Sequence, residues 1–386
     1  MTDPVPLLVK LIGCRSVTPD EGGALSFVEG VLGQKGFRSE RLKFSSSGTA
    51  DVDNLFARYG TGGPHFCFAG HTDVVPPGDE ASWKHPPFGG DIAEGAIYGR
   101  GASDMKGSVA AFMAAASDFI DSRKPSFKGS ISLLLTGDEE GAAINGTAKV
   151  LLWLKQRNLV PDHCLVGEPT SGKRLGDTIK VGRRGSLSVS LTASGRQGHS
   201  ALPQLADNPI PKLVRLLDRL ASHKLDEGTD RFDPSNLALT SVDVGNPATN
   251  VIPAKASAKL NIRFNPLHSG ESLARWIEAE ARRVEAEMGG RFEVQFSEAA
   301  EAFLTKPGPF IEVVRRAVHE TSGVEPQLSA SGGTSDARFI KNFCPVIEFG
   351  PRYTTIHQVD ECIPIEELIA LKEIYLAVLE NYFGSA

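Results

Sequence analysis

Short apolar segments alternate with helix-like segments in the first half of the chain. Segments 65–70, 130–137 and 162–169 are apolar and brief, which is typical of buried strands. Segments 24–37, 107–120 and 146–159 have the length and spacing of helices. Strands that alternate with helices predict an α/β fold, in which helices cover both faces of a mostly parallel sheet.

The pattern changes after about residue 183 and returns near residue 298. Between these points, strand-like segments and two helical segments follow in a β-α-β-β-α-β order, with strands at 185–195, 254–264 and 291–299 and helices at 207–223 and 272–288. This order predicts a ferredoxin-like α+β insert with an antiparallel sheet and helices on one face. Helices at 309–323 and 364–383 then flank a buried strand at 343–350. We therefore expect one domain built from residues 1–183 and 298–386, split around a second domain at 184–297.

Charge and composition exclude several classes of function. The 386 residues include 41 basic and 47 acidic residues, a formal charge of −6, so no basic excess supports a nucleic-acid-binding surface. No run of 18 apolar residues is present, which predicts that no segment crosses a membrane. The N-terminus lacks the basic region of a signal peptide, so we expect a cytoplasmic protein. The cysteines are odd in number and lack CxxC pairs, so we expect buried, reduced thiols at Cys14, Cys67, Cys164, Cys344 and Cys362.

Acidic and histidine side chains collect where predicted strands end or a helix begins. These residues are His71, Asp73, Asp104, Glu139, Glu140, Glu168 and His357. In an open α/β sheet such positions converge on the crevice beyond the carboxyl ends of the strands. So many ionisable groups in one place would repel one another and lose hydration unless a cation lay among them. Taken singly, each has an ordinary interpretation as a solvated or hydrogen-bonded residue; their joint placement favours a site.

The two histidines together with Asp104, Glu140 and Glu168 form a ligand set of nitrogens and hard oxygens that suits zinc or a similar ion. Five ligands exceed the three that a single catalytic zinc takes, so they predict a two-metal site with one bridging carboxylate. Asp73 follows His71 by two residues and is expected to accept the imidazole N–H. Glu139 precedes a predicted ligand and is expected to point at the water that the metal activates.

Several motifs in the chain resemble those of the dinuclear zinc aminoacylase and carboxypeptidase family, which includes acetylornithine deacetylase-like enzymes. In order, they are GHTDVVPPGD, GRGASDMKG, TGDEEG, VGEPT, GRRGSL, QGHSALPQLADNP, TNVIP, GGTSDARF and GPRYTTIHQVDE. The resemblance covers nearly the whole chain. It implies a zinc-peptidase-like catalytic domain with two zinc ions per subunit, cobalt being an alternative in the second site. It also implies a homodimer made by the inserted domain.

The resemblance also implies individual roles. His71, Asp104 and Glu168 would hold one zinc, and Asp104, Glu140 and His357 the other, with Asp104 bridging. Glu139 would be the general base, Asp73 its supporting acid, and His199 of the partner subunit would stabilise the oxyanion. The residues expected to bind substrate are Arg183, Asn250, Arg263, Gly333, Thr334 and Ser335.

The narrower motifs, GRRGSL, LADNP, GGTSDARF and TIH, imply an amidohydrolase of lysine and diaminopimelate biosynthesis. Its reaction would convert N-succinyl-LL-2,6-diaminopimelate to succinate and LL-2,6-diaminopimelate. The chain departs from that pattern at Leu202, Thr249 and Tyr353, all in the layer that contacts substrate, so a related zinc deacylase acting on another N-acyl amino acid, such as N-acetylornithine, stays open as the alternative. An aminopeptidase or a binding module that has kept only the fold is less favoured, because the arginine motifs, the ligands and the base are all present.

Overall fold

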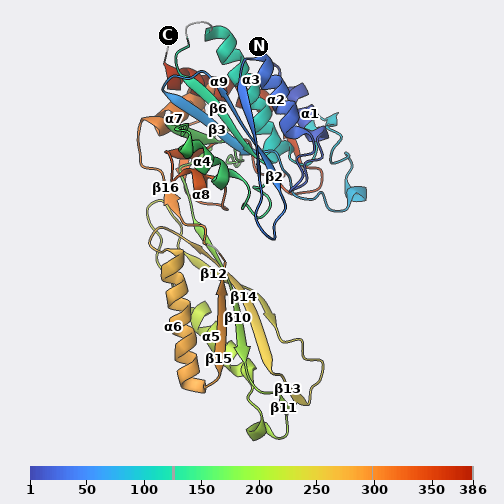
Figure 1. Ribbon diagram of the computed structural model, residues 1–386, viewed down its shortest axis with the longest axis vertical. Coiled ribbons are helices and arrows are strands. Elements are labelled where there is room, and N and C mark those ends of the chain that lie inside the picture. Colours follow the sequence, from blue (N-terminus) through green and yellow to red (C-terminus); the bar gives the residue numbers. More distant parts are fainter. Residues whose placement is uncertain (124–126, 298, 385–386) are drawn as a thin grey trace. The chain divides into compact units, whose positions relative to one another are not determined.

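A computed structural model describes residues 1–123, 127–297 and 299–384, which divide into two compact units. The first unit comprises Met1–Val181, Thr305–Ser329 and Ser335–Ala386, and the second comprises Gly182–Leu304 and Ala330–Thr334 (Figure 1). Residue 298, at which we predicted the return to the first domain, lies outside the described residues, as do residues 385–386. Each unit has a hydrophobic core of its own.

The first unit is built on an eight-stranded sheet with the order β1-β2-β6-β3-β7-β18-β8-β17. Its strands are β1 (Arg38–Phe44), β2 (Val52–Tyr59), β3 (His65–His71), β6 (Ser130–Thr136), β7 (His163–Val166), β8 (Thr178–Lys180), β17 (Gln327–Ser329) and β18 (Val346–Glu348). The central strands β6, β3, β7 and β18 run parallel, whereas β1 and β2 form an antiparallel edge. A separate small sheet contains β4 (Ile92–Ala93), β5 (Ala96–Tyr98) and β19 (Cys362–Pro364).

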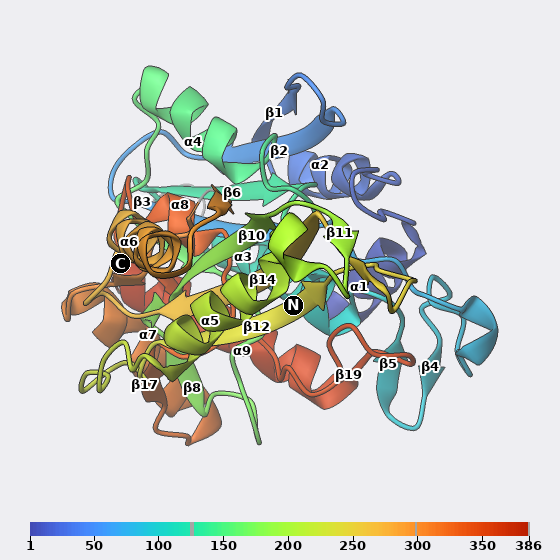
Figure 2. The same ribbon diagram turned by 90° about the horizontal axis from the view of Figure 1, so that it is seen from below.

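Helices cover both faces of this sheet, as the alternating sequence pattern predicts. They are α1 (Pro4–Gly13), α2 (Ala24–Gln34), α3 (Gly107–Arg123), α4 (Thr147–Gln156), α7 (Pro309–Ser322), α8 (Ala337–Ile340) and α9 (Ile365–Phe383). Helix α3 packs beside α9 on one face, and α4 lies on the other (Figure 2). Strand β2 shows why both faces are covered, because its successive side chains point to opposite faces of the sheet. Leu55 lies in the hydrophobic core that also contains α3, whereas Phe56 contacts Trp153 of α4.

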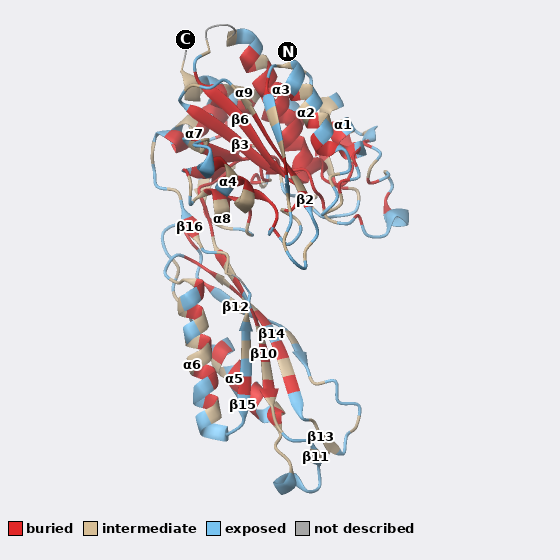
Figure 3. Ribbon diagram, viewed as in Figure 1, coloured by how far each residue is buried: buried red, intermediate tan, exposed pale blue. Residues whose placement is uncertain are grey.

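Burial explains why the central strands read as continuous apolar runs. Every residue of β3 and β6 is buried, and thirteen of the seventeen residues of α3 are buried as well (Figure 3). Parallel strands enclosed on both faces have no solvent-facing side, so they lack period-two alternation. All five cysteines are free and four of them are buried, as expected, whereas Cys362 is only partly buried.

The second unit has a four-stranded antiparallel sheet with the order β12-β14-β10-β15. Its main elements are β10 (Gly185–Ser194), α5 (Pro209–Ser222), β12 (Asn236–Asp243), β14 (Lys255–Phe264), α6 (Gly270–Met288) and β15 (Arg291–Phe296). The second unit also has two small two-stranded sheets outside the main sheet. One pairs β9 (Gly182–Arg183) with β16 (Phe303–Leu304), and the other pairs β11 (Gly198–His199) with β13 (Val251–Ile252). The apolar positions of β10 and β14 pack against both α5 and α6, so both helices cover one face, as predicted.

Some elements were not predicted from the pattern. The α1 helix, the β1–β2 hairpin and the second strand of the insert, β12, had no segment of their own in the sequence interpretation. Strand β1 buries only one of its seven residues, and β12 buries none, so neither carries an apolar run. In the part of the chain that is described, no helix is both long and apolar enough to cross a membrane.

Candidate metal centre

Four of the candidate ligands are placed by the carboxyl ends of parallel strands and by one turn. His71 is the last residue of β3, Glu140 lies in the loop after β6, and Glu168 follows β7 by two residues. Because β6, β3 and β7 are parallel neighbours, these ends meet at the same edge of the sheet. Asp104 lies in an irregular turn, Ala102–Lys106, that leads directly into α3.

The first group of ligand atoms joins His71, Asp104 and Glu168, and all three residues are buried. Nε2 of His71 lies 3.2 Å from Oδ1 of Asp104 and 3.8 Å from Oε1 of Glu168. One ligand atom from each residue lies within 4.8 Å of the others, which is the spacing expected around a single ion.

The second group joins Asp104, Glu140 and His357. Nε2 of His357 lies 2.9 Å from Oε1 of Glu140 and 3.4 Å from Oδ2 of Asp104. Asp104 thus turns one carboxylate oxygen to each histidine. The structure therefore brings all five predicted ligands together in two overlapping groups that share Asp104.

The orientation of the His71 ring tests whether a cation fits. Its Nδ1 lies 2.9 Å from the backbone carbonyl oxygen of Asp73, which can only accept, so Nδ1 carries the ring proton and donates it. Nε2 then faces the carboxylate oxygens of Asp104 and Glu168, and this cluster of acceptors is satisfied only when a cation, either a proton on Nε2 or a metal ion, lies between them. Imidazole nitrogen and carboxylate oxygen are donors that zinc accepts, so the residues fit such an ion.

The electric field at this centre strongly favours positive charge. Hydrogen bonds to Asp104 and then Glu140 raise the pKa of His357 to about 10. Burial, the largest single influence, lowers the pKa of His71, but the carboxylates of Asp104, Glu139 and Glu168 together raise it well above its usual value. Burial and the nearby Glu168 carboxylate raise the pKa of Glu139 well above that of a free glutamate.

Asp73 contacts different groups from those that the sequence led us to expect. The imidazole N–H of His71 goes to its backbone carbonyl, while the carboxylate oxygen Oδ1 is 3.7 Å from Nδ1. The carboxylate instead accepts the backbone N–H groups of Glu139, at 3.3 Å, and Glu140, at 3.1 Å. Asp73 is fully buried, and burial raises the pKa of its carboxyl to about 6. It therefore holds the loop that carries both the expected base and one ligand.

A second buried acid, Glu361, was missed by the sequence interpretation. Its carboxylate accepts backbone N–H groups from Gly101, Ser103 and Asp104 and pairs with Arg100. Burial raises the pKa of Glu361, and Arg100 and these backbone groups oppose the rise. Glu361 lies in the GPRYTTIHQVDE motif, but a single acid beside a predicted turn carried no local signal of these contacts.

His199, expected to stabilise the oxyanion, and Asn250, expected to bind substrate, lie together in the second unit. His199 pairs with Val251 between β11 and β13, and the carbonyl of Asn250 accepts the backbone N–H of Ser200. The side chains of His199 and Asn250 are exposed. Nδ1 of His199 accepts the backbone N–H of Ala201 at 3.0 Å, so its proton resides on Nε2, which can donate outward.

Arginine side chains gather elsewhere in the second unit. Arg183 is buried, and its Nη1 donates to the carbonyl of Gly333 at 3.0 Å. Arg263 is half-buried; burial, and then the charge of Arg184, lower its pKa. Among the described residues, Nη1 of Arg263 and Nε of Arg184 are buried without a hydrogen-bond partner. Like charges with unpaired donors favour an anion, so Arg184 is a further candidate that the sequence interpretation left out.

The glycine-rich loop spans the two units. Gly333 and Thr334 belong to the second, whereas Ser335 belongs to the first, where its buried hydroxyl donates to Oε1 of Glu348 at 2.5 Å. Of the three positions that depart from the family pattern, Leu202 and Thr249 are exposed in the second unit and Tyr353 is exposed in the first.

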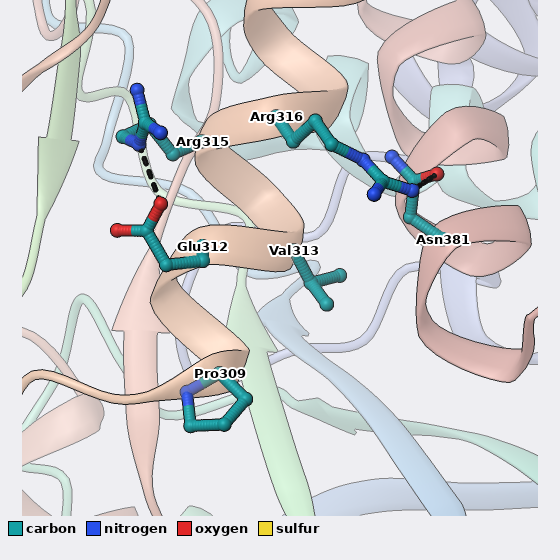
Figure 4. Close-up of a pocket in the computed structure, with 6 residues that line it drawn as sticks. All are labelled: Pro309, Glu312, Val313, Arg315, Arg316 and Asn381. Carbon is teal, nitrogen blue, oxygen red and sulfur yellow. Dashed lines mark hydrogen bonds and ion pairs between the residues drawn. The ribbon is translucent and has the colours of Figure 1, made fainter.

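A surface cavity on the first unit contains none of these residues. It has a volume of about 250 Å³ and is lined by Pro309, Glu312, Val313, Arg315, Arg316 and Asn381 (Figure 4). Arg315 pairs with Glu312 at 2.8 Å, and Arg316 donates to Asn381 at 2.6 Å. Because its charged groups are already paired, this cavity is a poorer candidate than the acid-rich centre.

Comparison with known families identifies the fold and the chemistry. The family model described as "Peptidase family M20/M25/M40" matches residues 67–381. The chain belongs to this family. Its members include a metallo-carboxypeptidase from Sulfolobus solfataricus, whose structure superposes with a TM-score of 0.78 at 18% identity, covering 99% of this chain and 100% of that one. A dinuclear metal-binding peptidase from Bacillus subtilis superposes with a TM-score of 0.72 at 15% identity, covering 99% and 98%. These structures confirm the predicted fold class.

Relatives of higher identity are named succinyl-diaminopimelate desuccinylase. The protein of Parvibaculum lavamentivorans is 55% identical over 382 residues, 99% of this chain and 96% of its own length. That of Rhodospirillum centenum is 56% identical over 384 residues, 100% of this chain and 98% of its own length. The protein is accordingly a hydrolase that acts on amide bonds.

Proposed function

We propose that the protein hydrolyses N-succinyl-LL-2,6-diaminopimelate to succinate and LL-2,6-diaminopimelate, in the biosynthesis of diaminopimelate and lysine. The observation that carries the proposal is the pair of ligand groups that share Asp104, in a chain more than half identical to proteins named for this reaction. The same relatives favour the succinyl substrate over N-acetylornithine. The expected location is the cytoplasm.

The metals of this proposal are two zinc ions, with cobalt as an alternative in the second site. His71, Asp104 and Glu168 would hold one ion, and Asp104, Glu140 and His357 the other. When bound, the two ions supply charge that polarises the amide carbonyl and lowers the pKa of water.

Glu139 is the proposed general base. Its carboxylate lies within 4.8 Å of ligand atoms of His71 and Glu140, and burial raises its pKa, which makes it a stronger proton acceptor than a free glutamate. Glu139 takes a proton from the attacking water and then gives it to the nitrogen of the leaving amine. Asp73 assists indirectly, because its carboxylate holds the backbone of Glu139 and Glu140.

The second unit has two proposed roles, homodimer formation and completion of the partner's active site. The Nε2–H of His199 is available to donate to the oxyanion that forms at the carbonyl. Strand β12 is an edge strand with exposed Leu239 and Val242, 41% and 56% exposed, which is typical of an edge that pairs with another chain. In this proposal the first unit is the catalytic domain, predicted from sequence at 1–183 and 298–386. The second unit, Gly182–Leu304 with Ala330–Thr334, is the dimerisation domain, predicted at 184–297.

Substrate carboxylates are the proposed ligands of the arginine side chains. N-succinyl-diaminopimelate has three carboxylates, and guanidinium groups bind carboxylates through two parallel hydrogen bonds. Arg183 and Arg263, together with Arg184, supply donors for them, and Asn250 with the Gly333–Thr334–Ser335 loop supplies polar contacts around the amine.

The test is succinate release from N-succinyl-LL-2,6-diaminopimelate by the zinc-loaded protein, with N-acetylornithine assayed in parallel. Preference for the succinyl substrate is expected, and preference for the acetyl substrate would refute the proposal. Glu139→Gln should retain both metal ions and lose activity by ~10²–10⁴-fold, the contribution typical of a general base. Glu380→Gln, an exposed carboxylate on α9, is the matched control and should leave the rate unchanged.

A further inference from the structure

A buried ion pair joins the two segments that carry Asp104 and His357. Arg100 and Glu361 are 3% and 0% exposed, and Nη1 of Arg100 lies 2.8 Å from Oε2 of Glu361. Neither residue is a proposed ligand, base or substrate contact. Glu361 lies only four residues from His357 in the chain, and Arg100 lies four residues from Asp104.

The carboxylate of Glu361 accepts hydrogen bonds from the turn that bears Asp104 and from the two residues that precede this turn. Oε1 accepts the backbone N–H groups of Ser103 and Asp104, each at 3.0 Å. Oε2 accepts the N–H of Gly101 at 3.1 Å as well as the guanidinium of Arg100. These three hydrogen bonds fix the backbone of the turn, and the one from Asp104 acts on the residue that the two ion sites share.

Arg100 makes the reciprocal contacts with the segment that bears His357. Its Nη1 donates to the carbonyl of Gln358 at 3.1 Å, and its Nη2 donates to the carbonyl of His357 at 3.4 Å. His357 has a φ of +61°, the left-handed region that non-glycine residues rarely adopt. Such a conformation persists where surrounding contacts determine it, and Arg100 supplies contacts at this carbonyl.

We propose that Arg100 and Glu361 are positioning residues that set the separation of the two ion sites, by fixing the Asp104 turn against the His357 segment. The inference rests on the proposed dinuclear function. The two residues are expected to affect different ion sites. Glu361 fixes the shared ligand Asp104 and so affects both sites, whereas Arg100 fixes the backbone of His357 and so affects only the site that His357 serves.

The experiment is a titration of the metal-free protein with cobalt(II), followed by calorimetry and by the visible absorption of the bound ion. Glu361→Gln places an amide NH₂ against N–H donors and should lower the affinity for both ions by ~10–100-fold. Arg100→Lys keeps a cation beside Glu361 but cannot serve both carbonyls. It should lower the affinity for one ion by ~10-fold, change the spectrum of that ion only and leave the other ion unchanged.

The matched control is Glu280→Gln in the second unit. Glu280 is also buried and paired with arginines, Arg219 at 2.7 Å and Arg283 at 2.6 Å, but it lies on α6 and belongs to no ligand group. It should bind two cobalt ions with the affinities and the spectrum of the unaltered protein. The thermal transition of each metal-free variant shows whether it is folded.

Two results would overturn the positioning role. One is normal affinity and spectrum for both ions in Glu361→Gln and Arg100→Lys. The other is loss of the folded state in both variants but not in Glu280→Gln, which would assign the pair to folding alone. Failure of the proposed function looks different, because it appears in the unaltered protein: either fewer than two cobalt ions bind, or two bind and no succinate is released.

Discussion

Replacing Asp73 with asparagine separates two explanations of what this buried carboxylate does. The sequence led us to expect that it accepts the imidazole N–H of His71. In the structure that proton goes to the carbonyl of Asp73, and the carboxylate accepts the N–H groups of Glu139 and Glu140. Asp73→Asn leaves the carbonyl in place and alters only the contacts with the loop.

The size of the effect follows from those two hydrogen bonds. One oxygen becomes an NH₂ group that faces an N–H, so one charge-assisted bond is lost, and the other becomes a bond between neutral groups. Bonds to a charged acceptor contribute ~1.5–3 kcal/mol, and distances of 3.1 and 3.3 Å place these toward the weaker end. If ~2 kcal/mol of the free energy that holds Glu139 in position is lost and appears in the activation barrier, kcat/KM falls about 30-fold.

The assay is hydrolysis of N-succinyl-LL-2,6-diaminopimelate at saturating zinc, with bound zinc counted in the same samples. We expect two zinc ions per subunit and about 30-fold lower kcat/KM. Asp226→Asn is the matched control, since Asp226 also accepts backbone N–H groups, from Gly228 and Ser235, in the second unit. An unchanged rate per zinc-loaded subunit in Asp73→Asn would refute the reasoning. Loss of the ion held by His71 and Glu168, with the ion at Glu140 and His357 retained, would return the carboxylate to the role expected from sequence.

Three further predictions concern substrate binding, assembly and stability. Arg263→Met should raise KM by ~10–100-fold and change kcat little, because a charge-assisted contact to a substrate carboxylate is lost in the ground state and in the transition state alike. Steady-state kinetics measure both constants, and an unchanged KM would contradict the prediction. Leu239→Lys should give a monomer in size-exclusion chromatography with light scattering. This monomer should bind zinc but lack activity; an active monomer would refute the proposed role of His199 in the partner's active site. Burial lowers the pKa of His65 from 6.5 to about 4, so its contribution to folding is complete above pH 6.5 and is lost as the pH falls toward 4. Urea unfolding of the unaltered protein should show that this group lowers the free energy of unfolding by ~3 kcal/mol between pH 6.5 and 4. His65→Asn should lack this decrease, and an equal pH dependence in the two proteins would refute the prediction.

Much of the fold could be predicted because burial leaves a local mark. The enclosed strands β3 and β6 read as apolar runs, and α5 and β14 carry the periodicity of a helix and of a half-buried strand. Strands β1 and β12 escaped notice for the opposite reason: they lie at sheet edges and keep polar or exposed side chains, so the pattern that marks a strand is weak in them.

The candidate centre was predictable to the level of residues but not of atoms. His71 and Glu168 were found because chemistry-bearing side chains at the ends of parallel strands must share one edge of the sheet. The partners of Asp73 could not be found in this way. A carbonyl and a carboxylate of the same residue are equally close to His71 in sequence, and only the path of the backbone selects between them.

The sequence by itself thus determined the α/β core, the inserted α+β unit and the set of metal-ligand candidates, because each depends on hydrophobic period or on position relative to a strand end. Tertiary structure alone decided that Asp104 turns one oxygen to each histidine, that His357 adopts a left-handed backbone, and that Arg100 and Glu361 connect their two segments. Apart from the contact of Asp104 with His71, 33 positions away, these features involve contacts between residues more than 250 positions apart. Such contacts have no period and no local composition, since they form only when folding brings the two segments together.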